Sequence, residues 1–280
     1  MGYSTGSYDA NDSRVIQQHG IWLAEADVDY ALIDWTNDIN YVYNVTENRP
    51  DFDMIEKTVP LIFDIWKNIT NAPKIAIHLG ISGEKEAFTD GRLQGKIDQV
   101  YDQFIANPDY RDQYFYYQGK PLIVVYCGTP SPFVDGVPED IDDRFTFRYS
   151  TGFITEQPNL RNWDFSKYGY WSWEDRGEQT YTMIDGKPEH CVITAAYRSQ
   201  GSLGDDGYIP AGERNNGEYF RASWKRARDL LVSSVLVVVW NEFYTWESDN
   251  VENNKDIEPN EEYGYEYFNI MKEEIAKFKE

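Results

Sequence analysis

Short apolar segments recur along this chain, and longer amphipathic segments separate them. Each short segment is almost continuously apolar or aromatic, which is typical of strands in a parallel sheet covered on both faces. Strands that alternate with helices form βα units. The expected strands are Tyr30–Trp35, Lys74–Leu79, Leu122–Cys127, Phe145–Ile154, Tyr168–Trp173, Cys191–Tyr197 and Val235–Trp240.

The segments between these strands repeat apolar residues at helical spacing. We expect a first helix that begins near Asn11 or Asp12 and a second that follows Asp51 as its N-cap. The same pattern predicts a helix just before the last strand, with Phe220, Trp224, Ala227 and Leu231 on its apolar face, and a final helix with Tyr263, Tyr267, Ile270 and Phe278.

This alternation predicts an α/β fold, a (β/α)8 barrel of the TIM type, and 280 residues suit one such barrel. A closed barrel has eight strands, and seven are recognised. Either the sequence begins after the first strand, or the barrel is incomplete or closes irregularly. No repeat, low-complexity tract or linker divides the chain, so we expect a single catalytic barrel domain over residues 1–280.

The charge of the chain excludes several classes of partner. Lys and Arg total 26 against 48 Asp and Glu, a net charge of −22 that repels nucleic acid and anionic membranes. No stretch approaches 18 apolar residues, so no membrane insertion is expected. We interpret the acidity chiefly as a source of solubility.

No metal or organic cofactor is expected. Cys127 and Cys191 lie inside apolar segments and are expected to be buried free thiols. The three histidines lack the spacing of a metal motif. The acidic stretch Glu247–Glu262 offers Asp249, Glu252 and Asp256 to calcium, but its spacing is not that of a calcium loop, and we expect a long solvated loop at one barrel mouth.

Aromatic residues make up 16% of the chain, which indicates a glycan partner. Sugar rings pack their apolar faces on aromatic side chains, although core packing also uses many aromatics. Candidate stacking residues are Trp35, Trp171, Trp173 and Trp246, each of which is alternatively a core residue.

In barrels of this class the active site gathers at the carboxyl ends of the strands. The residues that follow each apolar segment form a set rich in carboxylates, aromatics and amides, which suits sugar recognition and glycosidic bond chemistry. They are Asp34, Trp35, His78, Tyr126, Glu174, Asp175, Tyr197, Arg198, Asn241 and Glu242.

The clearest signal is Val235–Glu247, in which Asn241 and Glu242 directly follow a run of β-branched residues. Glycosidases need two carboxyl groups, one as acid and one as base or nucleophile. We therefore interpret Glu242 as catalytic, and Asn241 as a group that orients it or binds a hydroxyl. Alternatively, Glu242 pairs with an arginine at the barrel rim.

Three acids are candidates for the partner of Glu242. Glu247 ranks first, and its alternative is a solvated loop acid. Glu174 ranks second, with an ion pair to Arg176 or Arg198 as the alternative. Asp34 ranks third, and a role as hydroxyl ligand or helix cap is favoured for it.

Other polar residues are candidates for substrate binding. Arg198 and Arg214 can hold a hydroxyl or carboxylate bidentately, or form internal ion pairs. His78 is a candidate to contact sugar or to tune an acid.

Several stretches resemble the endo-α-mannosidases of glycoside hydrolase family 99 and the α-1,3-glucanases of family 71. Their order and spacing cover nearly the whole chain: Gly6–Asp9 before a helix with Val15-Ile16, Asp27–Trp35, Gly119–Leu122 with Val124–Tyr126, and Glu213–Phe220 followed by Trp224, Trp240–Phe243 and Ile257–Pro259. The resemblance implies a glycosidase barrel whose first strand would lie before Met1.

Two departures from the family pattern concern the active site. The family's second glutamate, three residues after the one matched by Glu242, is Thr245 here, and Glu247 is the nearest substitute. The endo-mannosidases also carry a glutamate after the third strand, where this chain has His78-Leu79-Gly80. The family's anhydro-sugar mechanism and mannan specificity are therefore not carried over.

The sequence thus predicts a glycoside hydrolase acting on a polysaccharide or oligosaccharide. A degenerate, glycan-binding barrel and a polysaccharide lyase or other sugar-directed barrel hydrolase are the alternatives. The resemblance implies a secreted, periplasmic or cell-surface location. Met1–Asp9 lacks the basic and apolar regions of a secretory signal, so we expect any leader to have been removed from this sequence.

Overall fold

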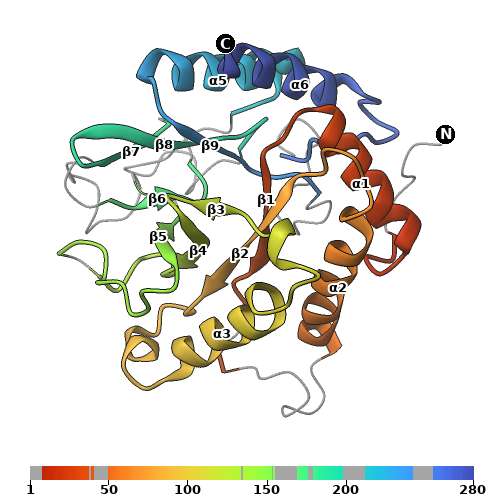
Figure 1. Ribbon diagram of the computed structural model, residues 1–280. Coiled ribbons are helices and arrows are strands. Elements are labelled where there is room, and N and C mark those ends of the chain that lie inside the picture. Colours follow the sequence, from red (N-terminus) through yellow and green to blue (C-terminus); the bar gives the residue numbers. More distant parts are fainter. Residues whose placement is uncertain are drawn as a thin grey trace. The chain divides into compact units, whose positions relative to one another are not determined.

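The structure is a computed structural model, and it describes residues 8–37, 39–40, 50–133, 135–152, 154, 169–175, 179–197, 212–241 and 255–280 (the backbone alone for 50–54). The chain forms two compact units, which are described separately (Figure 1). The N-terminal unit comprises Tyr8–Phe133 and Pro138–Ser150, and the C-terminal unit is mainly Thr151–Glu280. The prediction of a single domain stays a prediction.

The N-terminal unit is built on a parallel sheet in which β1 (Tyr30–Trp35), β2 (Lys74–Gly80), β4 (Lys120–Tyr126) and β5 (Thr146–Thr151) lie in that order. Its central strands β2 and β4 are buried along nearly their whole length, as their apolar sequences predict. The short strand β3 (Tyr116–Tyr117) pairs antiparallel with the start of β4 and was not expected from the sequence.

The described part of this unit contains the α-helices α1 (Ser13–Glu25), α2 (Pro50–Trp66) and α3 (Arg92–Val100). Asp12 is the N-cap of α1, because its side chain accepts a hydrogen bond from the Arg14 amide at 2.9 Å, as predicted. The start of α2 differs from the prediction, since the helix already includes Pro50 and Asp51 lies within its first turn. The prediction missed α3, which continues into a π-helical segment, Tyr101–Ile105.

The C-terminal unit contains the strands β6 (Trp171–Ser172), β7 (Tyr181–Ile184), β8 (Lys187–Ile193) and β9 (Ser234–Val237). Strands β8 and β9 are parallel, as expected, whereas β7 forms an unpredicted antiparallel hairpin with β8. Both cysteines are buried free thiols, Cys127 in the N-terminal unit and Cys191 on β8, as predicted.

Helices α5 (Glu218–Leu230) and α6 (Glu266–Lys279) lie side by side in this unit (Figure 1). Phe220, Trp224 and Ala227 form the buried face of α5, but Leu231 is wrongly assigned to that face. It caps the helix in a left-handed conformation and is 82% exposed, because the helix ends one residue before it.

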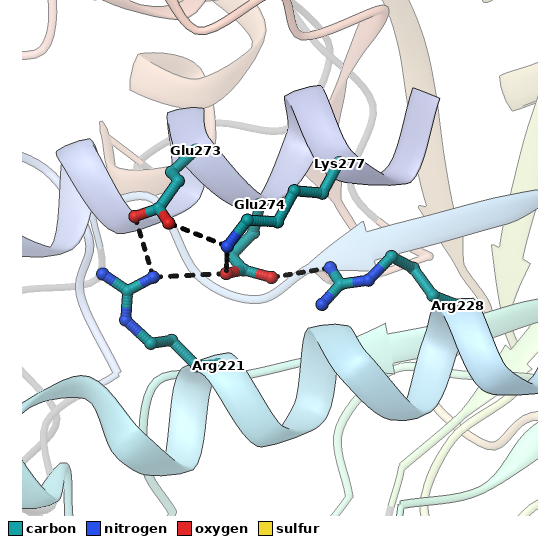
Figure 2. A network of polar contacts seen from close by, with 5 residues as sticks. All are labelled: Arg221, Arg228, Glu273, Glu274 and Lys277. Atoms are coloured by element: carbon teal, nitrogen blue, oxygen red, sulfur yellow. Dashed lines mark hydrogen bonds and ion pairs between the residues drawn. The ribbon is translucent and has the colours of Figure 1, made fainter. Parts of the chain in front are cut away.

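A carboxylate on α6 joins the two helices. Glu274 is buried, and it accepts hydrogen bonds from Arg228 at 2.6 Å, Lys277 at 2.8 Å and Arg221 at 3.2 Å (Figure 2). Burial opposes ionisation, but the bonds from Lys277 and Arg228 outweigh it, so the pKa of Glu274 lies below its ordinary value.

Within the predicted solvated loop Glu247–Glu262, the structure describes residues 255–262. Four of these, Asp256, Ile257, Glu258 and Pro259, are buried, contrary to the expectation, whereas Glu261 and Glu262 are exposed. The acidic composition did not reveal the buried part, because its hydrogen bonds are made by the backbone of Asp256, Ile257 and Glu258. No helix in the described part of the chain is long and apolar enough to cross a membrane.

Candidate functional site

Polar side chains gather at the carboxyl ends of the strands in the N-terminal unit. Asp34 on β1 is paired in register with His78 on β2, so both side chains point to the same face of the sheet. Tyr126 on β4 is paired in register with Ser150 on β5, two residues further toward the strand ends on that face. His78 Nε2 lies 2.7 Å from Ser150 Oγ, and the His78 ring meets the Tyr126 ring edge to face at 6.1 Å.

His78 is completely buried, which determines its charge. Burial lowers the pKa of its imidazole to about 4, against the opposing influence of the Asp34 carboxylate. At neutral pH the ring is therefore uncharged and acts as a hydrogen-bonding partner of Ser150 rather than as a cation.

Asp34 and Tyr126 are the more accessible members of this row. Asp34 is exposed, and its Oδ1 accepts hydrogen bonds from the Thr36 amide at 2.8 Å and the Thr36 hydroxyl at 2.7 Å. This bonding shapes the turn after β1; no helix begins at Thr36, so Asp34 is not a helix cap there, and its role as hydroxyl ligand stays a prediction. The Tyr126 hydroxyl lies 2.6 Å from Thr129 Oγ1, within the loop that follows β4.

Trp35 does not join this row. It follows Asp34 on β1 and therefore points to the opposite face, where its ring is buried near Phe104, at 6.2 Å, and the Lys96 ammonium, at 6.0 Å. In this structure Trp35 is a core residue beneath the helices.

A second group of polar residues follows β6 in the C-terminal unit. Glu174 Oε1 accepts a hydrogen bond from Lys255 Nζ at 2.9 Å, and both side chains are largely buried. Glu174 therefore takes part in an ion pair, with a lysine that lies 81 residues away in sequence. The alternative considered for it, an ion pair with Arg176 or Arg198, concerns two residues outside the described part of the chain. Trp173, the residue before Glu174, is half-buried, and its amide donates a hydrogen bond to the Thr151 carbonyl at 2.9 Å.

Two neighbours of Glu174 are committed to the interior. Asp175 accepts hydrogen bonds from the Ser172 hydroxyl at 2.6 Å and the Thr180 amide at 2.8 Å, and burial raises its pKa to about 6. Trp171 stacks on His190 at 4.1 Å and donates to Glu189 at 2.9 Å. Asp175 and Trp171 therefore build the support for this segment, and Trp171 is placed in the core rather than on a surface open to sugar.

Strand β9 ends at Val237, three residues before the predicted end at Trp240, and the chain beyond it is tied to the segment Lys255–Pro259. The Trp240 carbonyl accepts hydrogen bonds from the Ile257 amide at 3.2 Å and the Glu258 amide at 2.9 Å. Asn241, the next residue, is exposed. The backbone that leads to Glu242 is therefore held in place by the chain that returns at Ile257.

Arg214 holds this returning segment from the other side. It is 1% exposed, its Nη2 donates to the Asp256 carbonyl at 2.7 Å, and its guanidinium lies 4.3 Å and 4.1 Å from the ring centres of Tyr263 and Tyr267. No carboxylate of a described residue pairs with it. A buried guanidinium packed against two tyrosine rings and bonded to a carbonyl positions the backbone, and the role of substrate clamp considered for Arg214 has no support in this geometry.

Four of the predicted site residues lie outside the described residues: Glu242, Glu247, Arg198 and Trp246. The sequence analysis missed Ser150 and Lys255, which become visible only when strand register and distant contacts are known. Among the described residues, no three His, Cys, Asp or Glu side chains are arranged to hold a metal ion.

Parallel strands, alternating helices and polar groups at the strand ends define an α/β fold of the TIM-barrel type, as predicted. The solved structures similar to this chain include the GH99 endo-α-mannosidase from Bacteroides thetaiotaomicron and the same enzyme in complex with bis-tris-propane. Each covers 99% of this chain at 13% identity, with TM-scores of 0.60 and 0.62, and the match spans 83% and 88% of the solved chains. The resemblance inferred from the sequence is thereby confirmed at the level of the fold. No protein-family model and no curated protein matches the chain.

Proposed function

We propose that this protein is a glycoside hydrolase that cleaves a polysaccharide or oligosaccharide by carboxylate acid/base chemistry at the carboxyl ends of its strands. The observation that carries the proposal is the anchored backbone at Trp240, three residues beyond the end of β9. Asn241 is exposed directly after a carbonyl held by two amides, and a glutamate is the next residue in the sequence. The glycosidase fold shared with the endo-α-mannosidase structures supports the same reaction class.

Glu242 supplies one of the two carboxyl groups in this proposal, and Glu247 is the preferred partner. Glu174 is the second candidate, but its Oε1 is occupied by the Lys255 ammonium, a fixed arrangement that suits a supporting role better than repeated proton transfer. Bond cleavage requires one carboxyl group to protonate the leaving oxygen while the other acts as base or nucleophile.

The remaining site residues bind substrate in this proposal. Asp34, Tyr126 and Asn241 offer hydrogen bonds to sugar hydroxyls, and Trp173 offers a half-buried ring for stacking. Arg198 and Trp246 keep the same assignment from the sequence alone. His78 acts from beneath the surface by fixing Ser150 beside Tyr126.

A glycan-binding barrel without catalysis is the second candidate, favoured by one feature of the sequence. Position 245 is threonine where the related family has a glutamate. Binding of oligosaccharide without release of a new reducing end by the wild-type protein would support this candidate over the hydrolase. An unsaturated product absorbing in the ultraviolet would instead indicate a lyase.

The test is the substitution Glu242→Gln, assayed for reducing-end release from a panel of neutral polysaccharides. Loss of a catalytic carboxyl group is expected to lower the rate on the order of a thousandfold or more while leaving oligosaccharide affinity within a few fold. Glu261→Gln, at an exposed glutamate of the same unit, is the matched control and should leave the rate unchanged. Full activity of Glu242→Gln would remove residue 242 from the mechanism.

A further inference from the structure

A cleft of about 410 Å³ lies in the N-terminal unit, between two loops that follow strands. One loop follows β2 and contains the short 3-10 helix Lys85–Phe88, and the other follows β4 and contains Phe133, Pro138 and Glu139. Both loops leave from the carboxyl ends of their strands, which is the edge of the sheet that carries His78 and Tyr126. A cavity of this size falls within the range of roughly 300–1,000 Å³ that is usual for small-molecule sites.

The backbones of the two loops approach each other closely at two glycines, Gly83 and Gly128. Gly128 has φ +102, and a Cβ atom built on it would lie 2.9 Å from the Gly83 Cα atom. Only glycine allows this left-handed conformation and this close approach together. The first loop is also held by Arg92, which donates to Asp90 Oδ2 at 2.8 Å and to Asn40 Oδ1 at 2.6 Å. The loops that form the cleft are therefore held by this backbone contact and by the hydrogen bonds of Arg92.

The floor of the cleft is aromatic, and its rim carries both charges. The rings of Phe88 and Phe133 are half-buried and meet edge to face at 5.1 Å. At the rim, Lys85 holds its ammonium 5.2 Å from the Phe133 ring centre, and Glu86 and Glu139 are exposed carboxylates. An apolar ring surface bordered by one donor and two acceptors matches a hexose, which has apolar C–H faces and hydroxyls around its edge.

From this geometry we propose that the cleft is a distal subsite that binds one sugar unit of a neutral glycan chain, beyond the units that contact the strand ends. A neutral ligand is favoured because the rim holds two carboxylates against one ammonium on a protein with net charge −22. The substrate class rests on the proposed function. A distal subsite makes affinity depend on chain length, because only a chain long enough to occupy the strand ends and the cleft together gains both sets of contacts.

The test measures binding rather than cleavage. Calorimetry would compare two-unit and six-unit oligosaccharides of the α-mannan, α-1,3-glucan, xylan and cellulose series on the wild-type protein, Phe133→Ala and Lys85→Ala. In the series that binds, the six-unit chain should bind more tightly than the two-unit chain, and Phe133→Ala should lower its affinity at least tenfold. Lys85→Ala, at an exposed residue that does not support the fold, should give a smaller loss of the same kind.

Tyr116→Ala is the matched control, since Tyr116 is an aromatic residue 43% exposed on β3, which pairs with the opposite end of β4. It should leave both affinities unchanged. Equal affinity of wild-type, Phe133→Ala and Lys85→Ala proteins for the long chain, an equal loss for both lengths, or no binding in any series would overturn the subsite. Length-dependent binding without product release would overturn the hydrolase proposal alone, and product release without any effect of Phe133→Ala would overturn the subsite alone.

Discussion

Lys255 Nζ lies 2.9 Å from Glu174 Oε1, and both side chains are largely shielded from water. A shielded pair of this kind is costly to break by removing one partner, because the other charge remains in the interior. It also joins the segment after β6 to the segment that returns to Trp240. Two candidate parts of the site in the C-terminal unit are thus connected through one ion pair.

Lys255→Met is therefore expected to lower the free energy of unfolding by about 2–3 kcal/mol, since the Glu174 carboxylate would be left without its cation. Urea unfolding measures this change. The double variant Lys255→Met/Glu174→Gln should recover part of the loss, and Lys255→Arg should retain most of the stability. Equal stability of Lys255→Met and the wild-type protein would show that the pair does not form.

His78 is expected to make stability depend on pH between about 6.5 and about 4. Its pKa is lower in the folded than in the unfolded protein, so the unfolded state binds more protons in this range. The contribution is fully present above the unfolded value and is lost as pH falls toward the folded one, by up to about 3 kcal/mol.

Unfolding free energies of the wild-type protein and His78→Asn, measured across this pH range, isolate the effect. The variant should be less stable at pH 7, and its deficit should shrink as the pH falls. A His78 imidazole that titrates near its ordinary value in an NMR experiment would contradict the expectation.

Glu274→Gln is expected to destabilise the contact between α5 and α6 by about 2 kcal/mol, because Arg228, Arg221 and Lys277 would lose their shared carboxylate (Figure 2). The folded pKa of Glu274 is depressed, so its contribution is present above the ordinary value of 4.5 and lost as pH falls through the lower, folded value. Thermal unfolding at pH 7 and pH 4 measures both effects.

The exposed pair Lys225–Asp229 on α5 provides the control for this variant. Asp229→Asn should cause no measurable change, because exposed ion pairs contribute little. If Asp229→Asn lowered the stability as much as Glu274→Gln does, burial of Glu274 would not explain the contribution of its ion pairs.

Strands that are long apolar segments could be predicted from the sequence. Strand β1 was predicted with its observed bounds, and β2 and β4 nearly so. The pattern missed β3 and β7, because these hairpin partners are only two and four residues long. It also missed α3, whose buried residues Leu93, Ile97 and Val100 stand among many polar ones.

The site could be predicted only in part, for a geometric reason. The polar residues near the end of each apolar run, Asp34, His78 and Tyr126, lie at one edge of the sheet, as predicted, and their part in a binding site stays a prediction. The sequence could not show that Asp34 and Trp35 have different roles. Neighbouring residues on a strand point to opposite faces of the sheet, and the sequence does not show which face is buried by helices. The partners of Glu174 and Arg214 lie 81 and 42 residues away, beyond any local pattern.

The double anchor at the Trp240 carbonyl has a consequence for how this protein can be altered. The chain reaches that carbonyl three residues after β9 ends and returns to it at Ile257 and Glu258, so hydrogen bonds fix both ends of the intervening stretch. The entropy of closing a loop grows slowly, by about 0.6 kcal/mol for each doubling. Insertions between Glu247 and Lys255, which leave the proposed catalytic glutamates and the Lys255–Glu174 ion pair unchanged, are therefore expected to cost folding little, and these positions are the natural place to diversify in a library that selects for new glycan preferences.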